Sequence, residues 1–117
     1  MIIIKGAIYR IVNSVNDKVY IGQTVKPLEV RLKEHIDAAY KLDILTDEYE
    51  YDTKFYRAIR KYGKDKFNIC LIKICNTELL NDEEIKYIKE YDSYKNGYNS
   101  TLGGGGNNRR KENPRRA

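Results

Sequence analysis

Near its N-terminus the chain alternates between apolar and polar positions in two short segments. Residues 7–12 and 18–22 are rich in β-branched and aromatic side chains, which favour strands. The polar residues 13–17 between them have the composition of a turn. The pattern therefore predicts two strands that pair as an antiparallel hairpin.

The hydrophobic period then changes to that of a helix. Apolar residues recur at helical spacing from Leu28 to Ala39, and Pro27 suits the first position of a helix, where no amide hydrogen is needed. This spacing predicts a helix over residues 27–40. Residues 41–53 carry no comparable period, and we expect them to form a loop.

The second half of the chain is predicted to contain two helices and one strand. Thr53 can cap a helix over residues 54–62. Residues 67–75 form a near-continuous apolar run of strand length, which we interpret as the central, buried strand of the sheet. Asn81 is the expected N-cap of a last helix over residues 82–91.

The end of the chain is rich in glycine. We expect a tight loop or short edge segment at residues 97–102 and a flexible break at residues 103–106. The predicted order of elements, β-β-α-α-β-α, indicates an α+β domain in which helices cover a mainly antiparallel sheet. Residues 1–106 are assigned to this domain, and residues 107–117 to a basic flexible tail or the start of a linker.

The composition is that of an ordinary globular domain. The 117 residues are 41% hydrophobic and 33% charged, which fits a single domain and excludes wholesale disorder. No apolar run approaches the roughly 20 residues of a membrane span, and the apolar residues 2–4 are too few for a secretory signal. We therefore expect a soluble, intracellular, cytoplasmic protein with no membrane partner, in the cytoplasm of a host cell if the chain is viral.

The positive charge is unevenly distributed. The net charge is +5, and residues 107–117 carry five basic residues against one acidic residue. Residues 54–66 carry six basic residues against one acidic residue. Two interpretations of the second segment stay open: a solvated helix face, or a surface that follows phosphates and binds less tightly as salt rises.

Cysteine and histidine are too few for several kinds of site. Cys70 and Cys75 lie five apart in one predicted strand, hence on opposite faces, which suits neither a disulfide nor a metal site. His35 is the only histidine, which excludes chemistry that needs a histidine pair. Eleven tyrosines supply most of the aromatic character, so some of them should line a wet cleft.

A carboxylate interrupts the apolar face of the last predicted helix. Glu84 lies on the same side of the helix as Tyr87 and Ile88. A buried carboxylate is costly unless it has a hydrogen-bond partner, a proton or a cation. Two interpretations stay open: Asn81 and Glu84 form a capping box, or Glu84 projects into a cleft as a metal ligand.

The first predicted helix also carries polar side chains beside its apolar stripe. Arg31 and His35 are four residues apart and share one face of this helix. A lone histidine at such a place is typical of a structural residue. An arginine keeps its charge and needs an anionic or carbonyl partner, of which phosphate is one.

Together with Tyr9, Tyr20 and Glu84, these residues form a set that could hydrolyse a phosphodiester. Glu84 would hold a divalent cation that neutralises charge on the phosphate, and Arg31 would stabilise the transition state. A tyrosine near the cation could have its pKa lowered enough to take a proton from water. Both tyrosines are equally compatible with plain packing in the sheet.

The segment Ala7-Ile8-Tyr9, followed ten residues later by Val19-Tyr20-Ile21-Gly22, resembles the signature of the GIY-YIG nuclease superfamily. Ala7 stands where the first motif of the family has glycine, and we expect perturbed packing at most. The resemblance covers residues 5–106. The further matching segments are Arg31 with His35, Tyr56-Arg57-Ala58-Ile59-Arg60-Lys61-Tyr62-Gly63, Glu84 ahead of Tyr87-Ile88, and Gly97-Tyr98-Asn99-Ser100-Thr101-Leu102-Gly103-Gly104.

The resemblance implies a metal-dependent endonuclease on a compact α/β sandwich with a three-stranded antiparallel sheet flanked by helices. It also implies that Tyr9 is the general base and that Tyr20 helps to arrange the water or the metal. Arg31 would steady the scissile phosphate. Glu84 would bind one Mg²⁺ or Mn²⁺ ion.

Three further residues match supporting positions of the family. By the resemblance, His35 and Asn99 assist proton transfer and hold the site together. Gly22 ends the second motif, at a point where the backbone comes close to neighbouring groups.

The chain is most similar to phage-type homing endonucleases, which usually carry a separate DNA-binding region after the nuclease domain. It is then either cut from a longer protein, with a C-terminal DNA-binding domain missing, or a small free-standing relative. DNA is the expected partner, and no obligate protein partner is inferred. The alternative hypothesis is a nucleic-acid-binding module of the same fold without catalysis. The residues expected to bind nucleic acid are Lys54, Arg57, Arg60, Lys61, Arg109 and Arg110.

Overall fold

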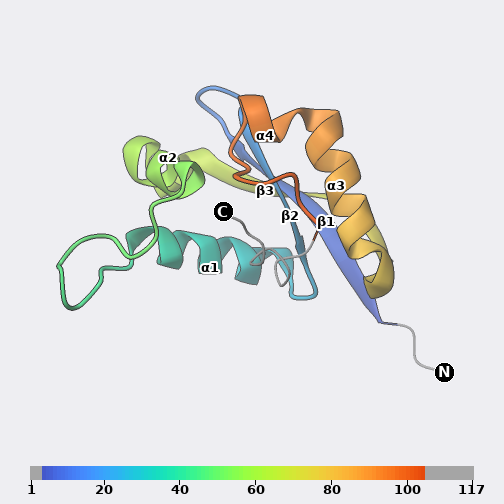
Figure 1. Ribbon diagram of the computed structural model, residues 1–117, viewed down its shortest axis with the longest axis horizontal. Helices are drawn as coiled ribbons and strands as arrows, with labels where there is room; N and C mark the ends of the chain where they lie inside the picture. The colour runs from blue at the N-terminus through green and yellow to red at the C-terminus, as the bar shows by residue number, and fades with distance from the viewer. Residues whose placement is uncertain (1–3, 105–117) are drawn as a thin grey trace, which may run out of the picture.

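Three strands form a single antiparallel sheet in the computed structural model, which describes residues 4–104. The strands are β1 (Lys5–Asn13), β2 (Val19–Thr24) and β3 (Phe67–Asn76), in the order β2-β1-β3 (Figure 1). The first two pair through the predicted hairpin turn. The three-stranded antiparallel sheet and the α+β class are confirmed.

The helices follow the predicted order. They are α1 (Leu28–Tyr40), α2 (Lys54–Tyr62), α3 (Leu80–Tyr91) and the short α4 (Ser93–Asn96), with single 3-10 turns at Lys64–Lys66 and Thr77–Leu79. Thr53 caps α2 as predicted, because its hydroxyl accepts a hydrogen bond from the amide of Tyr56. Gly63 ends the same helix at a φ of 94°, which favours glycine. Within residues 4–104 no helix is long and apolar enough to cross a membrane.

Helices cover both faces of the sheet, as an α/β sandwich requires (Figure 1). The core facing α1 and α2 contains Tyr9, Ile11, Ala39, Phe55, Ala58, Ile59, Phe67 and Tyr98. The core facing α3 contains Ile8, Ile21, Cys75, Leu80 and Ile88. The neighbours Ile8 and Tyr9 therefore point to opposite faces, and β1 is buried on both sides.

The prediction that residues 67–75 form the central strand is wrong. The central strand is β1, and β3 lies at the edge of the sheet, with Leu71 47% and Ile74 58% exposed. The pairing of β1 with β3 shifts between Ile8 and Tyr9, and this bulge leaves one residue of β3 without a partner. The first half of β3 therefore packs into one core and the second half into the other, which makes the whole segment apolar without burying it on both faces.

The same bulge changes the placement of the cysteines. Cys70 pairs with Arg10 and Cys75 with Gly6, and these two residues of β1 lie on one face. The prediction that the cysteines lie on opposite faces is therefore wrong. Both are free thiols, four pairs apart along the strand.

The last helix begins earlier than predicted. It starts at Leu80, directly after a 3-10 turn, so Asn81 lies inside the helix and caps nothing. The buried side chain of Leu80 fixes this start: it packs so close to Gly6 that a Cβ there would lie 2.6 Å from Leu80 Cδ1. The prediction that Asn81 is the N-cap is therefore wrong, and so is the interpretation of Asn81 and Glu84 as a capping box. Glu84 is left to make other contacts.

Candidate active site

Tyr9 lies in the middle of the sheet with none of its surface exposed. It pairs with Gly22 of β2, and a Cβ at Gly22 would lie 2.3 Å from the Tyr9 hydroxyl oxygen. Only glycine lets the phenol lie across β2 in this way. The expected close approach of the backbone at Gly22 is therefore found, and the partner is the Tyr9 side chain.

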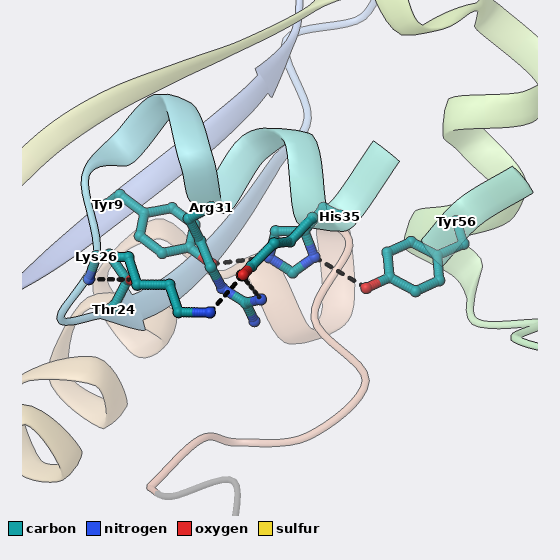
Figure 2. Close-up of polar contacts among 7 residues, drawn as sticks. Tyr9, Thr24, Lys26, Arg31, His35 and Tyr56 are labelled. Atoms are coloured by element: carbon teal, nitrogen blue, oxygen red, sulfur yellow. Dashed lines mark hydrogen bonds and ion pairs between the residues drawn. The ribbon is translucent and has the colours of Figure 1, made fainter. Parts of the chain in front are cut away.

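The side chain of His35 joins two phenols. It is 2% exposed, and it comes from α1. Its Nε2 lies 2.8 Å from the hydroxyl oxygen of Tyr9, and its Nδ1 lies 2.9 Å from that of Tyr56 on α2. Figure 2 shows the imidazole between the two rings. His35 is thus a bridge between the sheet and α2.

Burial keeps both groups of this pair neutral. Burial raises the pKa of Tyr9 well above its usual value of 10, and Tyr20 adds to the rise, while the charge of Arg31 opposes it. Burial also lowers the pKa of His35 from 6.5 to about 3, helped by the charge of Arg31. Without a bound cation, the protein therefore disfavours a phenolate at Tyr9. The hypothesis of a tyrosine beside a metal ion expects the opposite, a lowered pKa.

The charge of Arg31 acts on Tyr9: it lowers the pKa of Tyr9, and Tyr9 in turn raises the pKa of Arg31. Its Nη1 donates to Glu34 Oε1 at 3.0 Å, and Lys26 pairs with the same carboxylate. Burial by itself would lower the pKa of Arg31, but Tyr9 and Glu34 together raise it. The guanidinium is thus a permanent cation, half-buried at the candidate site.

Glu84 approaches the site from α3, on the other face of the sheet. Its Oε1 accepts hydrogen bonds from Gln23 Nε2 at 2.9 Å and from the amide of Gly104 at 3.1 Å. Within residues 4–104, Oε2 has no hydrogen-bond partner. The charge of Glu84 adds slightly to the raised pKa of Tyr9, whose main cause is burial.

The donor set at Glu84 fits one kind of metal. Within the described part of the chain no cluster of three or more histidine, cysteine or acidic side chains could enclose an ion. Mg²⁺ is commonly held by one or two carboxylates together with water and the phosphates of a substrate. The half-buried Glu84, with one oxygen available, fits such a site.

Tyr20 and Asn99 support the site from two sides. The ring of Tyr20 stacks on Phe55 with centroids 4.3 Å apart and lies edge-on to His35 at 5.1 Å. Asn99 is buried and pairs with the backbone of Ile21, accepting from its amide and donating to its carbonyl, both at 2.8 Å. Asn99 thereby holds the C-terminal loop against β2, next to Tyr20.

The predicted nucleic-acid contacts on α2 border an open pocket of about 630 Å³. It lies between α2, the hairpin turn and Tyr98, and its lining residues are Asn16, Lys18, Lys54, Arg57, Ala58, Arg60, Lys61, Tyr62 and Tyr98. The side chain of Arg60 is only 13% exposed and donates to the carbonyls of Ala39 and Tyr51, so it mainly ties α2 to α1 and the loop. Arg109 and Arg110 lie outside the described residues.

Three contacts of the site were missed by sequence analysis. Glu34 holds Arg31, Gln23 holds Glu84, and Tyr56 holds His35. Strand alternation places Gln23 on the same face as Ile21, so its proximity to α3 could have been predicted. No spacing in the sequence connects His35 to Tyr56, because the two helices meet only in the folded chain.

Acid is expected to destabilise the fold through His35. Between its folded pKa of about 3 and its ordinary value of 6.5, the unfolded chain binds a proton that the folded chain excludes. The free energy of unfolding should therefore fall as the pH drops below about 6.5, by about 2 kcal/mol at pH 5. Urea titrations at about pH 7 and pH 5 measure this, with His35→Gln showing a smaller difference.

The same prediction has an independent check. Because His35 is the only histidine, proton spectra follow its titration directly. Its ring signals should not shift between about pH 7 and pH 5 in the folded protein. A midpoint near the ordinary value would contradict the prediction.

Comparison with known proteins identifies the fold. The family model described as the GIY-YIG catalytic domain matches residues 5–99. Two structures of the catalytic domain of the intron homing endonuclease I-TevI, one of them a point mutant, superpose with TM-scores of 0.66 and 0.65. They are 30% and 28% identical to this chain, covering 85% and 82% of it and 96% and 98% of their own lengths.

Two relatives match by sequence. "Probable intron-encoded endonuclease 1" of Neurospora crassa is 32% identical over 102 residues, or 81% of this chain. "Uncharacterized protein 019R" of Invertebrate iridescent virus 6 is 32% identical over 91 residues, or 75% of it. The match spans 30% of the length of each relative.

The match to the family model covers both tyrosine motifs, the two site residues of α1, Glu84 and Asn99. The structural superpositions cover nearly the whole of the I-TevI catalytic domain. On this basis the chain belongs to the GIY-YIG catalytic domain family.

Proposed function

We propose that this chain is an endonuclease that hydrolyses phosphodiester bonds of DNA with one bound Mg²⁺ or Mn²⁺ ion. The observation that supports this most is that the charges of Arg31 on α1 and Glu84 on α3 both act on the buried phenol of Tyr9. A permanent cation, a carboxylate and a phenol that interact electrostatically suit the cleavage of an anionic diester. The likeness to the intron endonucleases supports the same activity.

Each residue then has a role that its contacts allow. Glu84 would hold the cation through Oε2, while Gln23 and the Gly104 amide orient the carboxylate through Oε1. The bound cation would supply positive charge next to the phosphate oxygens. The guanidinium of Arg31 would bind the scissile phosphate, and Glu34 would keep it directed at Tyr9.

Tyr9 can act as general base only if it does not become a free phenolate. Its pKa is raised by burial, so proton loss without transfer would be costly. Tyr9 has no exposed surface, so the proposed reaction requires that substrate binding give the attacking water access to its oxygen. His35 Nε2, 2.8 Å away, can then accept the hydroxyl proton of Tyr9 while the phenol oxygen takes one from that water. The oxygen of Tyr9 then stays neutral throughout.

DNA is the proposed substrate, and the pocket beside α2 is a proposed contact for its backbone. Lys54 and Lys61 line this pocket, and Lys18 adds a cation from the hairpin. The guanidinium of Arg57 already donates to the carbonyl of Asp52, so only its other hydrogens are available to a phosphate. These cations would bind phosphates at positions away from the cleaved bond.

The metal requirement gives the most direct test. Supercoiled plasmid should be nicked or cut by the protein in Mg²⁺ or Mn²⁺ and remain intact in excess EDTA, because the proposed reaction needs the cation at Glu84. Gel electrophoresis of the plasmid measures the result. Restoring Mg²⁺ to the chelated sample should restore cleavage.

The alternative, a non-catalytic nucleic-acid-binding module, predicts a different result. Duplex DNA would then be retained equally well with and without metal, and no product would form at high protein concentration. The basic pocket beside α2 would account for such binding, but the module would have no use for the half-buried carboxylate of Glu84.

A further inference from the structure

We propose that Tyr56 is a positioning residue of this site: its phenol oxygen accepts the Nδ1 hydrogen of His35 and thereby keeps Nε2 free to accept the proton of Tyr9. The inference rests on the proposed function for its effect on the reaction. Its structural part, the state of the imidazole, holds or fails independently of any cleavage. Figure 2 shows the three side chains in line, Tyr9 to His35 to Tyr56.

The contacts of Tyr9 determine which nitrogen of His35 carries the hydrogen. A neutral imidazole has one donor nitrogen and one acceptor nitrogen. Tyr9 has no exposed surface, and the hydrogen-bond partner that the described residues offer its hydroxyl is His35 Nε2. The phenol proton therefore points to this nitrogen. His35 Nε2 lies 2.8 Å away and accepts that proton only if it carries none itself.

The opposite tautomer would leave a buried proton without a good partner. With hydrogen on Nε2, the Tyr9 oxygen would accept from His35. Its own proton would then need a further acceptor at a residue with no exposed surface. An unpaired buried donor costs about 1–3 kcal/mol, which favours hydrogen on Nδ1.

Tyr56 is placed to complete this arrangement. Its oxygen lies 2.9 Å from Nδ1, and the residue is only half-buried, so its own hydroxyl proton can point to solvent. Tyr9 has no such freedom. Tyr9 therefore donates a hydrogen bond to the imidazole of His35, and Tyr56 accepts one from it.

The same contact matters when the proton moves. The attacking water breaks an O–H bond and a new one forms on the Tyr9 oxygen, while the former Tyr9 proton forms a bond to His35 Nε2. The imidazole becomes an imidazolium with both nitrogens as donors, one to Tyr9 and one to Tyr56. Burial disfavours the positive charge of this imidazolium. The oxygen of Tyr56 stabilises the charge by accepting the hydrogen on Nδ1.

Nuclear magnetic resonance of the protein alone tests the tautomer. His35 is the only histidine, so ¹H–¹⁵N spectra of the histidine-labelled chain contain one imidazole. Near neutral pH we expect a protonated Nδ1 and an unprotonated Nε2. A protonated Nε2 in the native chain would overturn the proposal, without any variant and whether or not the protein cleaves DNA.

The variant Tyr56→Phe tests the role in the reaction. It keeps the ring packed beside Phe55 and Tyr51 but removes the acceptor for Nδ1. We expect hydrogen on Nε2 to become populated and kcat to fall by about tenfold or more, with KM within about twofold. Lost DNA cleavage with an unchanged imidazole spectrum would contradict the proposal, as would an unchanged kcat.

Tyr51→Phe is the matched control. Tyr51 packs edge-on against Tyr56, with ring centroids 6.3 Å apart. Removing the Tyr51 hydroxyl therefore alters the same aromatic cluster but leaves the contact of Tyr56 with His35 Nδ1 in place. Its imidazole spectrum and kcat should equal those of the native chain. Equal effects of the two variants would mean that Tyr56 only packs, which would overturn the proposal.

Discussion

Replacing Glu84 with glutamine is expected to reduce DNA cleavage by about three orders of magnitude. The neutral amide keeps the size of the side chain and an oxygen for the Gly104 amide, but it removes the charge that would hold the cation. Loss of metal-ion stabilisation worth several kcal/mol corresponds to about 10³-fold in rate. Single-turnover cleavage of a labelled duplex in Mg²⁺ measures the effect.

Two controls separate chemistry from folding in this experiment. The thermal midpoint and the affinity for duplex DNA should stay close to those of the native chain. Glu90→Gln removes the same charge from an exposed position of α3 and should cleave normally. If Glu84→Gln retained more than about a tenth of the native rate, Glu84 would be a structural residue and the metal site would be misplaced.

Replacing Tyr9 with phenylalanine is expected to lower kcat by about 10²–10⁴-fold. The ring still fits beneath Gly22, but the oxygen that would accept the proton of the attacking water is gone. His35 Nε2 also loses its partner, which should lower the free energy of unfolding by about 1–3 kcal/mol. Rates at saturating DNA and urea titrations measure the two effects separately.

The control for this variant is another tyrosine. Tyr91 lies on α3 and is partly exposed, so Tyr91→Phe should leave cleavage and stability unchanged. Native cleavage by Tyr9→Phe would show that the phenol only packs in the core. The general base would then have to be sought among the other groups near Arg31.

The two variants should also differ in what metal can restore. Raising the Mg²⁺ concentration should partly rescue Glu84→Gln, because the amide oxygen is a weaker ligand than a carboxylate. The same change should not rescue Tyr9→Phe, whose missing group moves a proton.

The burial of the site explains why tyrosine and histidine are used here in neutral form. Tyr9 and His35 are almost fully buried, and both pKa shifts disfavour the charged state. A relay in which Tyr9 gives its proton to His35 as it takes one from water avoids a charge on Tyr9 and puts the transient positive charge on His35. The half-buried Arg31 and Glu84 supply the permanent charges at the boundary with solvent.

Local signals in the sequence determined most of the secondary structure. The alternation of residues 7–22 gave the hairpin, and the hydroxyl of Thr53 with the glycine at 63 set the ends of α2. These features depend on neighbours a few residues apart, so the chain itself encodes them. The spacing of the motifs likewise identified the family, and the match of the family model to residues 5–99 confirms it.

The tertiary structure decided the strand order and the start of α3. An apolar run predicts burial, but one bulge opposite Ile8 and Tyr9 lets β3 serve both cores from the edge of the sheet. Burial of Leu80 against Gly6 overrode the capping signal of Asn81. In both cases contacts between distant segments outweighed a local preference.

The candidate site divides in the same way. Residue type and spacing were enough to select Tyr9, Arg31, His35 and Glu84. Only the folded chain shows that His35 bridges two phenols and that one oxygen of Glu84 is already held by β2 and the C-terminal loop. Hydrogen bonds between residues more than twenty positions apart depend on how helices pack on the sheet, and no local period in the sequence records that packing.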